Sequence, residues 1–432
     1  MNKEILKIAV PSILSNIIVP VLGLVDLTIA GHIGTASLIG AVSVGAMMFS
    51  LIYWNFGFLR MGTTGMTAQA FGAGDGKTVM LTLCRAVILA LLIGLVIIAL
   101  QCPLRWLLLV VIAPSDDVTM FAARYFDIIV WGAPASLATM ALTGWFVGMK
   151  NSVFPLIVSV AVTFSNIVAS LSFVFLFGMG FEGIPTGTLI AQWIGFALSV
   201  LFALTLMRRH GLAWRADGRQ LIPGLGRFFK VNSEILMRSI CLMAVTLFFT
   251  SAGARSGDMV LAVNALFMQL HLFFSYFMDG FAYAAESLVG NFYGAGNVTS
   301  MRRCIKLIFR WGWLMAVLFS AVYGCFNGPV VELLADNDGV VRCAATYGGW
   351  IAVLPVVSMS AFVWDGVFVG LTATRQMLAS LAGATVAFFA VYFLCPSSVG
   401  ANHCLWLAFT VYLAVRGAIL WLIYRRMPFG KQ

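Results

Sequence analysis

The chain contains about twelve runs of apolar residues, each long enough to cross a lipid bilayer as a helix, which takes about 20 residues. The charged fraction is only 10%, whereas soluble domains carry about 25% charged residues. The sequence therefore predicts an all-α polytopic membrane protein and excludes a soluble globular fold. The predicted spans lie near residues 8–30, 38–60, 79–101, 121–146, 153–177, 184–207, 235–254, 260–290, 305–327, 345–370, 376–394 and 402–424.

The basic residues are distributed unevenly between the predicted loops. With the N-terminus placed inside, 20 of the 26 Lys and Arg residues fall on the inner side, Arg238 at the start of the seventh span among them, and 4 fall on the outer side. By the positive-inside rule, we expect a multi-pass protein of the cell inner membrane with both termini in the cytoplasm. The net charge of +10 then indicates contact with the anionic headgroups of the bilayer, and no nucleic-acid partner is expected.

The two halves of the sequence repeat each other. FGAGD at 71–75 matches YGAGN at 293–297, and Phe-Val-Gly at 146–148 matches 368–370, both at an offset of 222 residues. Each half holds six predicted spans, so both enter the membrane from the same side, related by a pseudo-two-fold axis along the membrane normal. Two six-helix lobes favour an alternating-access transporter. The expected parts are an N-terminal lobe over 1–210, a cytoplasmic linker over 211–232 and a C-terminal lobe over 233–432.

Asp26 is the most informative charge, because it lies in the apolar run PVLGLVDLTIAG with no basic residue within a helical turn. An ionisable group at membrane depth is by default a functional hypothesis. Such a carboxyl group can load and release protons, or it can serve structurally as a protonated group bonded to a neighbouring helix. Upstream on the same helix, Pro11 and Pro20 each remove a backbone donor and permit bending, although ordinary shaping of the helix explains them equally well.

Three further carboxylates fall inside predicted spans of the C-terminal lobe. Asp279 and Glu286 are seven residues apart and share one helix face. Arg60 and Arg416, both within spans, are candidate charge partners for one or two of these acids, so a static ion pair and a role in transport both remain open. Asp365 stands at the repeat equivalent of a threonine, so this acid is specific to the C-terminal lobe.

Motifs for enzymatic chemistry are missing from the sequence. No HExxH, GxSxG or P-loop pattern occurs, and the cysteines and histidines have no metal-ligand spacing, so no enzyme activity, metal or cofactor is expected. The glycine-rich stretches at 72–76 and 294–297 predict tight turns. Cys395 and Cys404 flank one outer loop, and a disulfide between them is an open alternative to two free thiols.

The motifs around these residues resemble those of the multidrug and toxic compound extrusion (MATE) family over nearly the whole chain. The resemblance rests on Pro11 followed by GLVDLTIAGHIG, on RMGTTGMTAQAFGAGD after the second span, and on AESLVGNFYGAGN after the eighth. MDGFAYAAES and WDGVFVG resemble the DNA-damage-inducible F (DinF) branch of that family.

This resemblance implies export of cationic or amphipathic organic compounds in exchange for protons or sodium. It makes Asp26 the proton-linked group and Pro11 the site of helix bending. On the fifth span, where the family often shows Asn and then Asp four residues later, this chain has Asn166 and Ser170, which line the expected N-lobe cavity. The single carboxylate favours protons, while sodium coupling and a lipid or glycolipid flippase remain alternatives. We expect a monomer.

Overall fold

The computed structural model describes residues 1–34, 36–212, 224–325, 331–332 and 338–429. The fold is 91% helical, with no β-strand among these residues. Within the described part of the chain, twelve helical segments are long and apolar enough to cross a membrane. The all-α fold and the number of predicted spans are therefore confirmed.

The chain divides into two compact units, which are described separately. The N-terminal unit comprises Val10–Asn232, and the C-terminal unit comprises Met1–Ala9 with Ser233–Gln432. Half of the predicted linker at 211–232 lies outside the described residues, so the lobe boundaries stay a prediction.

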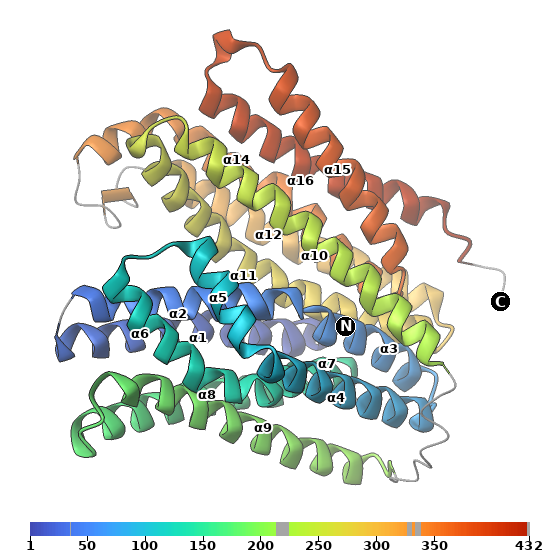
Figure 1. The fold of residues 1–432 in the computed structure, drawn as a ribbon. Coiled ribbons are helices and arrows are strands. Elements are labelled where there is room, and N and C mark those ends of the chain that lie inside the picture. The colour runs from blue at the N-terminus through green and yellow to red at the C-terminus, as the bar shows by residue number, and fades with distance from the viewer. Residues whose placement is uncertain (35, 213–223, 326–330, 333–337, 430–432) are drawn as a thin grey trace. The chain divides into compact units, whose positions relative to one another are not determined.

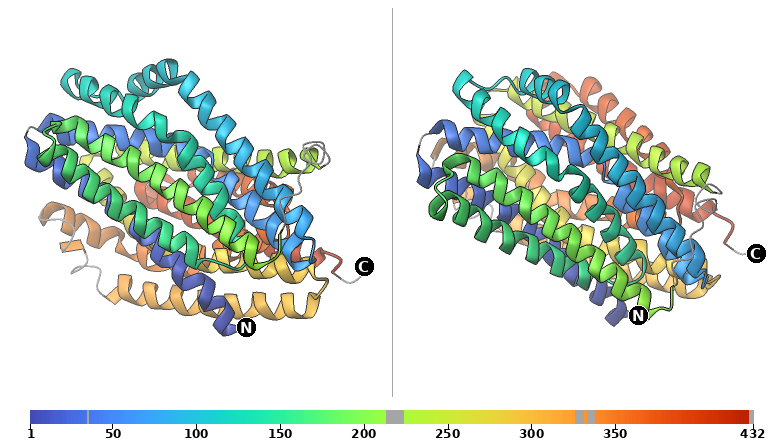
Figure 2. Two further views of the ribbon diagram at one scale, coloured as in Figure 1. Left: turned by 90° about the horizontal axis from the view of Figure 1, so that it is seen from below. Right: turned by 60° about the horizontal axis from the view of Figure 1, so that its bottom comes forward.

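The N-terminal unit is built from α1 and the eight helices that follow it (Figure 1). Helices α8 and α9 pack against each other and run side by side in both views of Figure 2. The prolines Pro11 and Pro20 lie inside α1, which is helical through both positions. The helices are α1 (Asn2–Ile33), α2 (Ala36–Asn55), α3 (Phe58–Gly72), α4 (Gly76–Ala99), α5 (Gln101–Ile112), α6 (Asp116–Ile129), α7 (Ala133–Gly148), α8 (Val153–Leu171) and α9 (Gly183–Arg209).

The second and fourth spans are each made of two consecutive helices, and the second span ends at Gly72, twelve residues beyond its predicted end at residue 60. Between α2 and α3 the helix breaks near Gly57, and between α6 and α7 a short 3₁₀ turn at Val130–Gly132 precedes Pro134. Proline lacks the backbone N–H that would continue a preceding helix but is well suited to a first helical turn. The break before α7 therefore follows from local sequence.

Helix α5 was not predicted. Its twelve residues are mostly apolar but too few to cross a bilayer. The sequence therefore predicts an outer loop between the third and fourth spans instead of a helix. Arg105 in this helix forms an ion pair with Asp127 in α6. This ion pair connects α5 to α6.

The described residues of the C-terminal unit form six long helices. Helices α12 and α16 both pack against α14, and α15 packs against α16. At the turn between the last two helices, Cys395 and Cys404 form a disulfide with Cα atoms 5.9 Å apart, so these two cysteines are not free thiols. The helices are α10 (Leu225–Ala254), α11 (Asp258–Gly294), α12 (Val298–Cys325), α14 (Asp338–Gly370), α15 (Thr374–Leu394) and α16 (Ala401–Arg426).

The two glycine-rich stretches form equivalent tight turns, as predicted. Gly74 and Gly296 have φ of 74° and 69°, a conformation that glycine adopts without steric cost. Each turn ends in a helix cap: Asp75 accepts a hydrogen bond from the Thr78 N–H at 3.0 Å, and Asn297 accepts one from Ser300 at 2.9 Å. The internal repeat in the sequence is thus a repeat of local structure.

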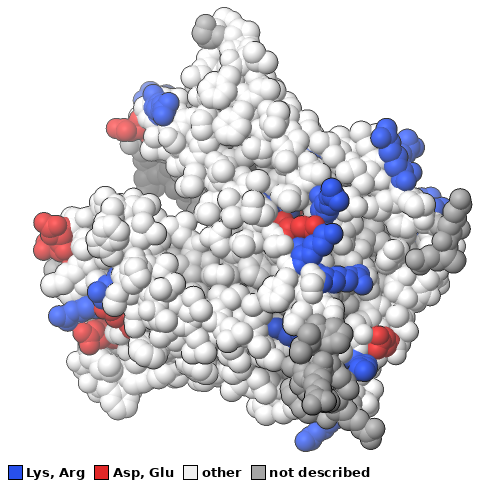
Figure 3. Space-filling model, turned by 45° about the vertical axis from the view of Figure 1, so that its right-hand side comes forward, with Lys and Arg blue, Asp and Glu red and all other residues white. Residues whose placement is uncertain are grey.

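Charged side chains are sparse on the molecular surface. On the face drawn in Figure 3, Lys, Arg, Asp and Glu form separate patches, and most of the area between them carries no charge. Many large apolar side chains are also exposed, such as Leu24, Val111 and Leu176. A surface of this kind is suited to lipid contact.

Candidate functional site

Asp26 is buried in the last third of α1, and its side chain reaches a threonine of α9. Its residue exposure is 3%, and its Oδ2 atom accepts a hydrogen bond from the Thr188 hydroxyl group at 3.3 Å. The Asn166 amide in α8 donates to the same Thr188 oxygen at 2.8 Å. Three helices therefore meet in one polar chain, which runs from Asn166 through Thr188 to Asp26.

The second carboxylate oxygen of Asp26 has no hydrogen-bond partner among the described residues. A buried acceptor without a partner is costly, and such groups are often kept for function. The Thr188 hydroxyl has a second acceptor in reach, the Ile184 carbonyl oxygen at 3.2 Å. Because a hydroxyl group donates only one hydrogen, Thr188 can serve Asp26 or Ile184, but not both at once.

This chain ends at a cavity of about 370 Å³ within the N-terminal unit. Asn166 and Thr188 line the cavity, while Asp26 lies one side chain behind them. Most of the remaining wall is apolar or hydroxyl-bearing, and Arg60 in α3 is part of it. A cavity of this size falls within the range of small-molecule sites.

Ser170 lies apart from this cavity wall. It is fully buried, and its hydroxyl group donates to the Ile184 carbonyl oxygen at 3.3 Å. Gly187 in α9 faces it so closely that a Cβ atom there would overlap its backbone. Ser170 therefore lies where α8 and α9 touch, one helical turn from Asn166.

Thr188 was missed by the sequence analysis, although it joins the two residues that were singled out. Threonine is common in membrane helices and usually bonds to its own backbone. The available signal was that Thr188 and Gln192 are polar, four residues apart and hence on one face of an apolar helix. Both line the cavity.

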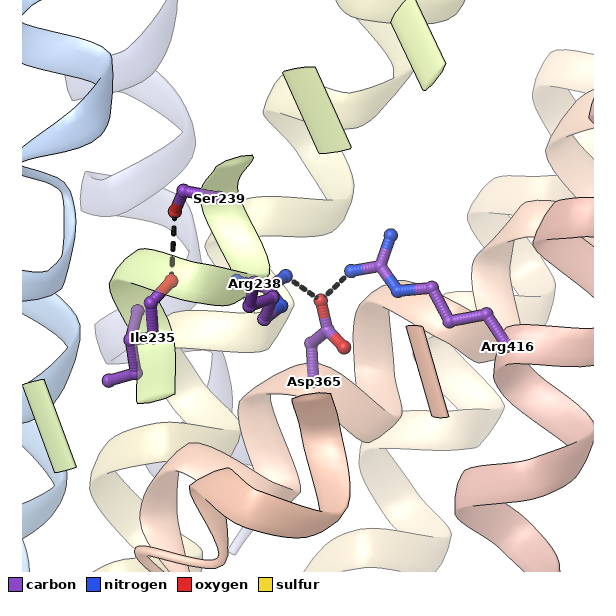
Figure 4. Close-up of polar contacts among 5 residues, drawn as sticks. All are labelled: Ile235, Arg238, Ser239, Asp365 and Arg416. Atoms are coloured by element: carbon purple, nitrogen blue, oxygen red, sulfur yellow. Dashed lines mark hydrogen bonds and ion pairs between the residues drawn. The ribbon is translucent and has the colours of Figure 1, made fainter. Parts of the chain in front are cut away.

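A buried ion cluster lies in the C-terminal unit. The Asp365 carboxylate in α14 is flanked by Arg238 of α10 and Arg416 of α16, and both guanidinium groups contact the same carboxylate oxygen (Figure 4). All three residues are at most 7% exposed. Burial of this kind is tolerated because opposite charges meet directly.

Arg238 corrects one sequence prediction. It was assigned to the cytoplasmic basic residues at the start of the seventh span, but the structure places it inside the apolar segment Leu225–Ala254, buried against Asp365. Helix α10 begins ten residues earlier than predicted, because amphipathic residues extend it beyond the apolar run. The sequence alone does not distinguish a basic residue on the cytoplasmic side from one that is buried at the end of an apolar helix.

The other predicted acids lie in α11. Glu286 is 1% exposed, whereas Asp279 is partly buried. Of the predicted acids, Asp365 contacts the Arg416 guanidinium group directly. The partnership predicted for Arg60 with the acids of the C-terminal lobe stays a prediction.

Twelve apolar spans among the described residues, buried carboxylates within both units and a ligand-sized cavity in the N-terminal unit point to a multi-pass membrane transporter. The MatE family model matches residues 11–172 and 235–394. The chain belongs to the MatE family.

Known relatives agree with this assignment. DNA damage-inducible protein F of Escherichia coli (strain K12) is 36% identical over 98% of this chain and 92% of its own length. The probable multidrug resistance protein NorM of Thermotoga maritima is 23% identical over 79% of this chain and 74% of its own. The crystal structure of the Vibrio cholerae MATE transporter VcmN in the bent form has a TM-score of 0.85, with 18% identity over 98% of this chain and 96% of that chain. This last match shows the shared fold.

Proposed function

We propose that this protein exports cationic or amphipathic organic compounds in exchange for protons by alternating access, with Asp26 as the proton-linked carboxylate. The observation that carries the proposal is the hydrogen-bonded chain from the cavity wall through Thr188 to Asp26. A buried carboxylate in a membrane span marks an ion pathway by default. Relatives named as multidrug resistance proteins support drugs as the substrate class.

The coupling step follows from the hydrogen bonds of Thr188. When Asp26 is ionised, its Oδ2 accepts from the Thr188 hydroxyl group. After Asp26 takes up a proton, it can donate to the Thr188 oxygen, and the threonine hydroxyl then turns to the Ile184 carbonyl oxygen. Thr188 is also bound by Asn166 on the cavity wall, so protonation alters the polar surface that a substrate meets.

The proline residues give α1 a way to respond to this change. Pro11 and Pro20 both lie inside the helix, upstream of Asp26, where each leaves a backbone carbonyl without its usual donor. We propose that proton uptake by Asp26 bends α1 and displaces bound substrate, and that release of the proton to the other compartment restores the site. The protein would work as a monomer in the cell inner membrane, with cytoplasmic termini and no cofactor.

Transport by the purified protein in proteoliposomes tests the coupling ion. A fluorescent organic cation is followed under an imposed pH gradient and, separately, under an imposed sodium gradient. We expect transport with the pH gradient alone and its loss in Asp26→Asn. Asp117→Asn is the matched control, because that carboxylate is exposed in the first turn of α6.

Three outcomes would contradict the proposal. Transport driven by sodium alone would favour the sodium-coupled alternative. Movement of a fluorescent lipid without dye transport under either gradient would favour a flippase. Full dye transport by Asp26→Asn, folded and inserted, would remove Asp26 from the mechanism.

A further inference from the structure

A second cavity, of about 960 Å³, lies wholly within the C-terminal unit. It is bounded by α12 and α16, which both pack on α14. Its inner wall is apolar and includes Ile305, Val356 and Gly417. Gly417 lies so close to Ser360 of α14 that a Cβ atom would stand 2.8 Å from the serine oxygen. Gly417 therefore allows α16 to pack closely on α14 at the wall of the groove.

The mouth of this groove is basic. Arg302, Lys306 and Arg310 are spaced four residues apart on α12, so they form one stripe along that helix. Arg425 in the last turn of α16 also lines the groove. All four side chains are exposed, and no acidic residue is among those that line the groove. The site thus selects negative charge.

Aromatic rings connect the basic mouth to the apolar wall. The Arg425 guanidinium carbon lies 4.4 Å from the centroid of the Trp421 ring. Trp364, 4% exposed, packs its ring against Phe309 at 5.0 Å and Tyr424 at 4.8 Å between centroids. Tryptophan and tyrosine gather where a membrane protein meets the headgroup layer. The rings therefore place this groove at the boundary between headgroups and acyl chains.

We propose that this groove is a binding site for an anionic phospholipid, such as phosphatidylglycerol. The headgroup phosphate would lie on the basic stripe, where arginine and lysine attract it electrostatically, and an acyl chain would cover the apolar wall between α12 and α16. The charge pattern separates this ligand from the organic cations proposed as substrates, which the same four residues would repel. The groove is thus a lipid site distinct from the transport cavity.

Native mass spectrometry of the purified full-length protein tests the site. Phosphatidylglycerol and phosphatidylcholine with identical acyl chains are titrated separately. We expect phosphatidylglycerol to bind at least ten-fold more tightly, and Arg302→Gln with Arg425→Gln to abolish this preference. Arg303→Gln with Arg426→Gln is the matched control, since it removes the same charge from the same helix turns at exposed residues outside the groove.

A further variant tests the apolar wall without changing charge. Ala418→Trp places a large ring in the groove from an exposed position of α16, and we expect it to weaken phosphatidylglycerol binding while both arginines remain. Size-exclusion profiles show whether each variant stays folded. Equal binding of the two lipids, or equal loss in both arginine pairs, would overturn the proposal. Displacement of the lipid by millimolar inorganic phosphate would also overturn it, because the site would then recognise phosphate alone.

Discussion

Gly366 in α14 lies directly against the backbone carbonyl oxygen of Ala282 in α11, so closely that no Cβ atom fits between them. In the N-terminal unit, Gly144 in α7 meets the carbonyl oxygen of Arg60 in α3 in the same way. Both residues of the second pair stand 222 positions before those of the first. The offset seen in the sequence therefore describes a repeated helix contact, and glycine is required at both copies.

Substitution of this glycine should destabilise the protein. Gly366→Ala forces α11 and α14 apart, and we expect a loss of about 1–3 kcal/mol in the free energy of unfolding. Gly349→Ala in the same helix is the control, because nothing lies within 4 Å of its Cβ position. There alanine should be neutral or stabilise by about 0.5–1 kcal/mol. Denaturation of both variants in detergent measures the difference, and equal stabilities would contradict the close contact.

Loss of the acid in the buried ion cluster should be more damaging. Asp365→Asn leaves Arg238 and Arg416 buried together without a direct counter-charge, and breaking a buried ion pair costs about 3–5 kcal/mol. Arg416→Met added to Asp365→Asn removes one of the uncompensated charges. The double variant should therefore be more stable than Asp365→Asn alone. Unfolding measurements on the wild type, on Asp365→Asn, on Arg416→Met and on the double variant form the test, and additive losses would show that the cluster does not act as a unit.

The cap at Asp75 should make stability depend on pH in the acidic range. The Thr78 hydroxyl and backbone N–H groups donate to the carboxylate at 2.5 and 3.0 Å and lower the pKa of Asp75 below its ordinary value of 3.8. The cap is therefore complete above that value and is lost as the pH falls through the lowered pKa of the folded state. Asp75→Ala should cost about 1 kcal/mol at neutral pH.

Asn297 provides the comparison for this prediction, since it caps the repeated turn without a titrating group. Asp75→Asn should keep most of the cap at neutral pH and remove the acid-dependent part. Melting temperatures at pH 7 and pH 3 are compared for wild type and both variants. An unchanged pH dependence in Asp75→Asn would assign the effect to other carboxylates.

The disulfide should be detectable by alkylation. Cys395 and Cys404 form a disulfide, whereas Cys84, Cys102, Cys241, Cys304, Cys325 and Cys343 do not. Denatured protein should therefore take up six alkylating groups without reductant and eight with it, as measured by intact mass. Replacing both bonded cysteines by serine should cost at most about 2–3 kcal/mol, because the loop between them is short. Eight labels without reductant would disprove the bond.

Thr188 should matter for transport as well as for packing. Thr188→Val keeps the shape of the side chain but removes the hydroxyl group between Asn166 and Asp26. We expect a several-fold lower rate of proton-driven dye transport in proteoliposomes. Thr186→Val is the matched control, because that hydroxyl group donates to the Glu182 carbonyl oxygen of its own helix turn at 2.7 Å. Equal rates in the two variants would argue against a role for Thr188 in coupling.

Local sequence was sufficient for much of this molecule. Apolar runs predicted the twelve spans, because a helix in lipid must satisfy its own backbone and present an apolar surface. The repeat predicted two equivalent turns, which glycine and a following cap residue determine within a few positions. Asp26 was found for the same reason, since a lone acid in an apolar run is conspicuous.

Only the tertiary structure decided which polar groups meet. Asp26 and Thr188 are 162 residues apart, and Arg238 and Asp365 are 127 residues apart. No periodicity within a single helix connects residues at such separations. Arg238 looked like a cytoplasmic charge and Thr188 like an ordinary helix residue until packing placed each beside a carboxylate. The sequence by itself determined the number and character of the helices, because those depend on neighbouring residues. The pairing of buried groups depended on helix packing, which brings distant residues together.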